Sequence, residues 1–198
     1  MSTKIYVEGG GNQKRTVTAC RAAFSKYFQK VAPAGALPRI VVSGSRQEAL
    51  DDFAKGLSDT KYDRVLLLVD AEQGVADGDD AWSHLQRRDS WVRPHGARDD
   101  SAHLMVQCME SWFMADKEYL STYFGQGFNA DALPARREIE LIPKNDVYAG
   151  LENATRGTKT KGEYHKTRHG FDILSGIDPE KVGRASPFAG QLHRSVQH

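Results

Sequence analysis

The stretches Lys4-Ile-Tyr-Val-Glu8 and Arg64-Val-Leu-Leu-Leu-Val-Asp70 decide the fold, because each is a short apolar run that ends in an acidic residue. Such runs predict strands, and the second run, which lacks polar alternation, predicts a strand covered by helices on both faces. Glu72 follows Asp70 by two positions. If the two strands are parallel neighbours, their carboxyl ends bring Glu8, Asp70 and Glu72 to one edge of a sheet.

The segments around these strands predict an alternation of strands and helices. Ser45 and Glu48 have the spacing of a capping box and mark one helix start. This alternation is typical of an α/β fold with a mainly parallel sheet flanked by helices. We predict further strands at residues 39–42 and 102–106, and helices at residues 14–31, 46–57, 82–88 and 109–124.

The pattern weakens from about residue 125, where glycine and proline interrupt it. Asn145 is expected to cap a helix that runs to Asn153, and the last fifty residues look helical. We therefore expect an α/β core at residues 1–124 and a helical C-terminal extension at residues 125–198 that packs on it. A single domain is the alternative.

Composition limits the classes of function. The chain has 198 residues and a formal net charge of +1, so any affinity for nucleic acid must come from local patches. No apolar run reaches the roughly 18 to 20 residues of a membrane span, and the start lacks a signal-peptide core, which predicts a cytoplasmic protein without membrane partners. Cys20 and Cys108 fit no zinc spacing and predict buried, reduced thiols.

The converging acids predict a metal site. Carboxylates held this close together are costly unless a hard cation joins them, and Mg²⁺ or Mn²⁺ takes such oxygen ligands. The alternative for each acid is a solvated turn residue. Glu110 is a candidate fourth ligand, with a solvated helix start as its alternative. The loop from Gly9 to Thr16 lacks the spacing of a P-loop, which argues against an ATPase.

A basic segment lies near the C-terminus. Between Thr155 and Gly170, five Lys or Arg residues and two histidines accompany a single acid. Lys161, Lys166 and His169 are expected to contact a phosphate backbone, although a solvated helix face is the other interpretation. Arg46, at a helix start beside a glycine turn, is also expected to contact phosphate.

The motifs also resemble a known family. Val7-Glu8-Gly9 and Val69-Asp-Ala-Glu72 resemble the TOPRIM domain, the metal-binding module of topoisomerases, primases and overcoming-lysogenisation-defect nucleases. The whole chain is more similar to a TOPRIM-like bacterial family, domain of unknown function 4276, which is often encoded beside ATPases in anti-phage loci. The stretches Ala102–Asp116 and Ile177–Pro187 carry much of this similarity.

The resemblance implies a TOPRIM-like, Rossmann-like fold and roles for three residues. Glu8 corresponds to the motif glutamate, a metal ligand or general acid/base, and Asp70 to the first residue of the D-x-D motif. Glu72 stands where the motif has an aspartate, and its longer side chain can still reach a cation.

The leading hypothesis is a Mg²⁺- or Mn²⁺-dependent endonuclease with Glu8, Asp70 and Glu72 as catalytic residues. It would hydrolyse DNA or RNA as the effector of a bacterial anti-phage or toxin-like system, with an AAA- or ABC-type ATPase as partner. The alternative is a non-catalytic interaction subunit of an ATPase-containing defence complex. A phosphotransferase or phosphatase acting on a small nucleotide would need a narrow pocket over the acids.

Overall fold

A parallel sheet forms the centre of the molecule. In the computed structural model, which describes residues 2–9, 11 and 13–197, its strand order is β2-β1-β3-β4. All neighbouring strands run parallel. The predicted α/β fold is therefore confirmed. The strands are β1 (Thr3–Glu8), β2 (Arg39–Ser43), β3 (Arg64–Asp70) and β4 (Ala102–Met105).

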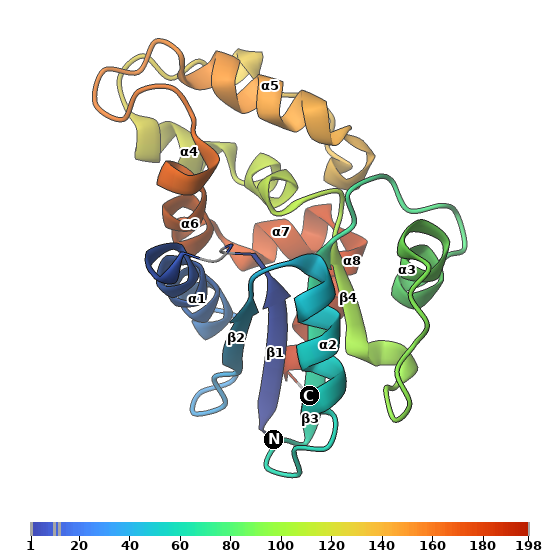
Figure 1. Ribbon diagram of the computed structural model, residues 1–198. Helices are drawn as coiled ribbons and strands as arrows, with labels where there is room; N and C mark the ends of the chain where they lie inside the picture. Colours follow the sequence, from blue (N-terminus) through green and yellow to red (C-terminus); the bar gives the residue numbers. More distant parts are fainter. Residues whose placement is uncertain (1, 10, 12, 198) are drawn as a thin grey trace.

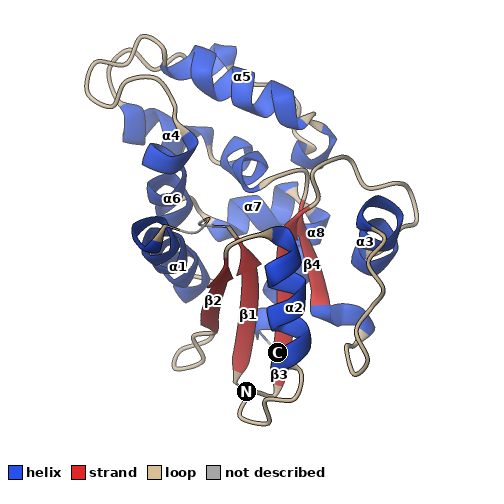
Figure 2. Cartoon of the chain, viewed as in Figure 1, coloured by secondary structure: helices blue, strands red, loops and turns tan. Residues whose placement is uncertain are grey.

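Helices cover the sheet and extend beyond the carboxyl ends of its strands, where α4 and α5 lie (Figures 1 and 2). The α-helices are α1 (Lys14–Gln29), α2 (Arg46–Gly56), α3 (Ala81–Asp89), α4 (Lys117–Phe124), α5 (Lys144–Thr155), α6 (Lys166–Gly176), α7 (Pro179–Ala185) and α8 (Pro187–Gln197). Short 3₁₀ helices are η1 (Asp99–Ser101), η2 (Met109–Ala115), η3 (Ala130–Ala132) and η4 (Ile139–Leu141). No helix in the described ranges combines the length and the apolar character that a membrane crossing requires.

Alternate strand residues bury opposite faces of the sheet. Ile5 and Leu68 pack into the larger apolar cluster with α1 and the C-terminal helices, whereas Tyr6 and Leu67 pack with α2 and α3. Figure 1 shows α2 and α8 on opposite faces of the strands. Because both faces are covered, β3 can be apolar at every position from Val65 to Val69, as its sequence predicted.

The C-terminal region shares its core with the sheet. Helix α6 packs along α1, and α8 packs on β4. Tyr27 of α1 and His193 of α8 share a hydrogen bond of 3.0 Å, and Trp112 of η2 stacks on Tyr27. The larger cluster thus joins residues from β1 to α8.

The helix boundaries confirm one local expectation and contradict two. The capping box of Ser45 and Glu48 at the start of α2 is confirmed. The single helix expected at residues 109–124 is wrong, because Asp116 breaks it: its carboxylate accepts from the N–H of Tyr119 and starts α4 anew. Asn145 does not cap α5, which begins one residue earlier at Lys144. Gly10 and Asn12, in the loop from Gly9 to Thr16 that was compared with a P-loop, lie outside the described residues.

Candidate functional site

The carboxyl edge of the sheet brings two of the predicted acids together. Glu8 is the last residue of β1 and Asp70 the last of the neighbouring β3. The Asp70 carboxylate is buried and accepts a hydrogen bond of 2.8 Å from the backbone N–H of Met109. This contact draws the segment after β4, and with it Glu110, toward Asp70.

Glu72 lies beyond the end of β3, on backbone that no longer has strand geometry. Strand β3 ends at Asp70. Glu72 has a φ of +68°, in the left-handed region of backbone conformation that residues other than glycine rarely adopt. Its N–H donates to the Gln107 carbonyl at 2.6 Å, and its carboxylate forms an ion pair with Lys144. Left-handed backbone of this kind costs roughly 1 to 3 kcal/mol and is maintained by its surroundings.

Glu110 is fully buried and is therefore not a solvated helix start. The hydroxyls of Tyr148 and Tyr164 each donate to one of its carboxylate oxygens at 3.1 Å. The Lys166 ammonium lies 3.7 Å from Glu110 and donates to the Tyr148 hydroxyl at 3.2 Å. Burial and the Glu110 charge both raise the pKa of the two tyrosines, so that they remain hydrogen-bond donors.

The four acids form one electrostatic unit around Asp70. The pKa of Asp70 is raised to about 7, first by burial and then by the charge of Glu110, with smaller contributions from Glu8 and Glu72 and an opposing effect of Lys166. Within the described residues the Asp70 carboxylate makes no ion pair of its own. Asp70 is thus a buried carboxyl group beside three other acidic side chains, and this environment disfavours its charged form.

Arg46 is tied into the protein. Its guanidinium donates to the Glu8 carboxylate at 2.9 Å and to the Asp70 carbonyl at 2.5 Å. It also forms a bidentate pair with the Asp89 carboxylate, with hydrogen bonds of 3.0 and 2.8 Å. It also lies over the Trp91 ring at 5.0 Å. Arg46 therefore holds the ends of β1, β3 and α3 together, and its predicted phosphate contact would require these bonds to open.

The basic segment divides into three different environments. The half-exposed Lys166 reaches the acids. Lys161 lies over the Tyr123 ring at 4.3 Å instead. His169 is 2 % exposed and lies among aromatic rings, and its Nδ1 accepts a hydrogen bond from the backbone N–H of His165. The structure thus brings Lys166 to the acids, keeps Lys161 apart from them, and encloses His169.

The acids fit a divalent cation in their chemistry, since all their donor atoms are hard carboxylate oxygens. Their arrangement fits less well. Among the side chains that the structure describes, no group of three or more His, Cys, Asp or Glu residues is placed to hold a metal ion. Glu8 and Glu72 point to Arg46 and Lys144 instead. A metal site here requires these two ion pairs to open.

Several residues of the site were missed from the sequence. Lys144, Tyr148, Tyr164 and Asp89 come from segments that carry no metal-ligand or nucleotide-binding motif. The spacing of four between Lys144 and Tyr148 places both on one side of α5. That spacing is common, so only the fold shows that both side chains meet the acids.

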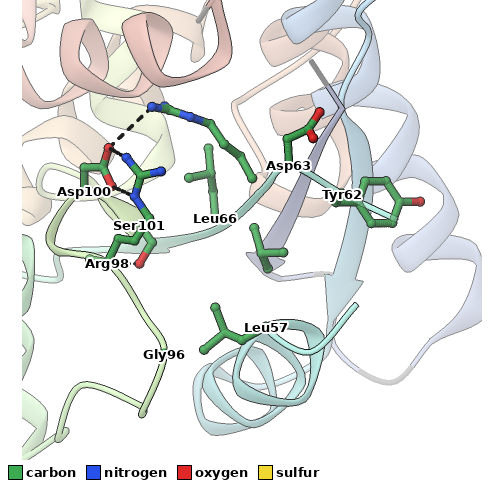
Figure 3. Close-up of a pocket in the computed structure, with 10 residues that line it drawn as sticks. Leu57, Tyr62, Asp63, Leu66, Gly96, Arg98, Asp100 and Ser101 are labelled. Atoms are coloured by element: carbon green, nitrogen blue, oxygen red, sulfur yellow. Dashed lines mark hydrogen bonds and ion pairs between the residues drawn. The ribbon is translucent and has the colours of Figure 1, made fainter. Parts of the chain in front are cut away.

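A separate cavity of about 130 Å³ lies at the opposite, amino-terminal edge of β3 and β4. Leu57 and Leu66 line its apolar side, and Arg98 and Asp100 face each other across from them (Figure 3). Arg64 also pairs with Asp100 at 3.6 Å. The charged groups of this cavity are thus largely neutralised by one another, and none of the predicted site residues lines it.

A profile of the family described as domain of unknown function (DUF4276) matches residues 7–197. The chain belongs to this family. The matched region includes the edge acids Glu8, Asp70, Glu72 and Glu110. No curated protein and no solved structure matches the chain. The description of this family names no activity.

Proposed function

We propose that this DUF4276 protein is a metal-dependent nuclease that hydrolyses phosphodiester bonds of DNA or RNA at the acidic edge of its sheet. The observation that supports it most is the position of Asp70. Its carboxylate is buried beside Glu8, Glu72 and Glu110, without an ion-pair partner among the described residues. Such a cluster is costly by itself and is relieved when a divalent cation joins it.

The proposal assigns the chain's own groups as follows. Asp70 and Glu110 would hold Mg²⁺ or Mn²⁺, joined by Glu8 and Glu72 once Arg46 and Lys144 release them. The bound ion would polarise a phosphoryl oxygen and lower the pKa of a water molecule. Lys166, which is half-exposed at the rim of the cluster, would donate to a phosphate oxygen.

The wider biological role is part of the same proposal. The similarity of Val7-Glu8-Gly9 and Val69–Glu72 to TOPRIM motifs suggests a relationship with TOPRIM nucleases. The resemblance of the whole chain to a family often encoded beside ATPases in anti-phage loci adds the role of effector in a bacterial anti-phage or toxin-like system. An AAA- or ABC-type ATPase would be its partner, inside the cytoplasm.

One observation favours a second candidate, a non-catalytic interaction subunit. Arg46 and Lys144 form ion pairs with Glu8 and Glu72. A protein that uses this edge only as a structural or binding surface would keep both ion pairs permanently. Activity and metal binding separate the two candidates.

The test compares the wild type with Asp70→Asn, which keeps the side-chain size. Purified protein is incubated with Mn²⁺ or Mg²⁺ and labelled DNA and RNA, and Mn²⁺ binding is measured by calorimetry. We expect Asp70→Asn to lower cleavage roughly a thousandfold and to weaken Mn²⁺ binding at least about tenfold. Chelation with EDTA should abolish wild-type cleavage.

Asp172→Asn is the matched control, because Asp172 lies on α6 and contacts the Tyr123 hydroxyl instead of the acid cluster. It should leave both measurements unchanged. A wild type that neither binds Mn²⁺ nor cleaves any of these substrates would reject the nuclease and favour the interaction subunit.

A further inference from the structure

One face of α5 runs from the acids to an open cavity. Lys144, Tyr148 and Glu152 are spaced by four residues and so lie on the same side of the helix. Lys144 contacts Glu72, Tyr148 contacts Glu110, and Glu152 lines the cavity. With a rise of about 1.5 Å per residue, this face covers about 12 Å.

The cavity lies between α5 and the start of α6 and has a volume of about 560 Å³. Tyr164 connects it to the acids, because Tyr164 lines the cavity and its hydroxyl donates to Glu110. The cavity therefore adjoins the proposed cleavage site. Its lining residues are Glu152, Glu163, Tyr164, His165, Thr167 and Arg168.

These groups complement a nucleotide better than a free anion. Arg168 offers a guanidinium that can pair with a phosphate, and Thr167 offers a hydroxyl. Glu152 and Glu163 would repel a lone phosphate, but their carboxylates can accept hydrogen bonds from the amino groups of a base. The cavity thus presents separate partners for the two ends of a nucleotide.

The acids are recessed, which restricts the form of the substrate. Asp70 is 9 % exposed and Glu110 is fully buried, while the side chains of Glu8 and Glu72 are 20 % and 26 % exposed. Double-stranded DNA is stiff, with a persistence length of about 50 nm, and bending it locally costs free energy. A flexible single strand can lower one phosphate into the recess without that cost.

The distribution of charge leads to the same restriction. Duplex binding depends largely on many Lys and Arg contacts to phosphates. Here the formal net charge is only +1, and the basic segment holds five Lys and Arg residues between positions 156 and 168. A short basic segment beside a recessed site suits a few phosphates of one strand.

We infer, building on the proposed function, that the substrate is a single-stranded nucleic acid that lies along the α5 face. The nucleotide next to the scissile phosphate occupies the cavity between α5 and α6, with its phosphate against Arg168. This assignment adds a substrate class and a strand path to the proposed cleavage site.

Binding without metal tests the path independently of catalysis. Fluorescence anisotropy in EDTA compares a labelled 20-nucleotide single strand of mixed sequence with a blunt duplex of the same sequence, for the wild type and Arg168→Ala. We expect the single strand to bind at least about tenfold more tightly than the duplex, and Arg168→Ala to weaken single-strand binding about tenfold. Removing one phosphate contact should also reduce the magnitude of the slope of log K against log salt concentration by about 0.7.

Arg184→Ala is the control, since Arg184 is an exposed arginine of α7 that pairs with Glu180 and does not line the cavity. It should change neither quantity. Equal binding of duplex and single strand, or equal losses in Arg168→Ala and Arg184→Ala, overturns the strand path.

Cleavage assays separate this inference from the proposed function. Single-strand binding through Arg168 without cleavage in Mn²⁺ leaves the path intact and rejects the nuclease. Equal cleavage of duplex and single strand supports the nuclease and rejects the path.

Discussion

Among single residues, Asp70 determines most of the site's electrostatics, and its titration can be measured without any ligand. Its pKa is raised to about 7 by burial first and by neighbouring carboxylates second. An unfolded aspartate titrates near 3.9. The folded protein therefore binds this proton more tightly than the unfolded chain. The Asp70 contribution to stability is complete below about pH 4 and is lost as the pH rises through about 7.

Asp70→Asn should remove this dependence, because asparagine remains neutral and can still accept the N–H of Met109. The wild type should lose on the order of 2 kcal/mol of unfolding free energy relative to Asp70→Asn between about pH 5 and pH 8. Urea unfolding in EDTA measures the difference. Asp172→Asn should follow the wild type, and a wild-type curve parallel to that of Asp70→Asn would contradict the raised pKa.

At this scale the sequence predicted the edge acids well and their partners poorly. Glu8 and Asp70 end parallel strands, so topology alone places them at one edge. For Glu110 the sequence left two interpretations open, a metal ligand or a solvated helix start. It could not decide between them, because the burial of Glu110 depends on the hydrogen bond from Met109 to Asp70. Lys144 and Tyr148 could not be predicted, since their role arises from the path of residues 125–143, which has no periodic pattern.

At the scale of elements, the start of α2 links local capping to the site. Ser45 Oγ accepts from the N–H of Glu48, the Glu48 carboxylate accepts from the N–H of Ser45, and the next residue, Arg46, reaches Glu8 and Asp89. Ser45→Ala removes the side-chain acceptor and should lower the unfolding free energy by about 1 kcal/mol.

Ser45→Asn should retain most of that stability, because asparagine is an equally good cap. Ser58→Ala is the control: Ser58 lies just beyond the other end of α2 and its hydroxyl contacts the Lys55 carbonyl, so its loss should cost less than about 0.5 kcal/mol. Chemical denaturation measures all three variants. A loss in Ser45→Ala no larger than in Ser58→Ala would show that the cap does not stabilise α2.

Element boundaries were predictable where the signal is local. The Ser45 cap and the apolar runs of β1 and β3 depend on neighbouring residues and appear in the structure as expected. The sequence favours Asp116 as a helix cap or salt-bridge partner, and its contacts with Tyr119 and Lys181 confirm both roles. The helix boundary at Asp116 was not predicted, because the residues on both sides of it are apolar at spacings that suit a helix. Lys181, 65 positions away, binds Asp116 at 2.7 Å, and no local pattern shows such a contact.

For the whole molecule, the expected division into a core at 1–124 and an extension at 125–198 can be tested by unfolding, because the two parts share an apolar cluster. One apolar cluster contains Ile5 of β1 and Phe24 of α1 together with Leu174 of α6 and Leu192 of α8. Without residues 125–198, the sheet face that packs against these helices would be exposed to water. A chain of residues 1–124 should therefore lack a cooperative unfolding transition, and the full chain should unfold in a single one.

Leu192→Ala tests this coupling in the full-length protein. Leu192 is fully buried, so its truncation should cost about 2 to 5 kcal/mol. If the chain is one cooperative unit, calorimetry will show one transition shifted to lower temperature. The combined fluorescence of the three tryptophans, of which Trp82 and Trp91 lie in the apolar cluster on the opposite face of the sheet, will change at that same temperature. A second transition that keeps its wild-type midpoint, or a folded fragment 1–124, would instead show that the two regions are separate domains.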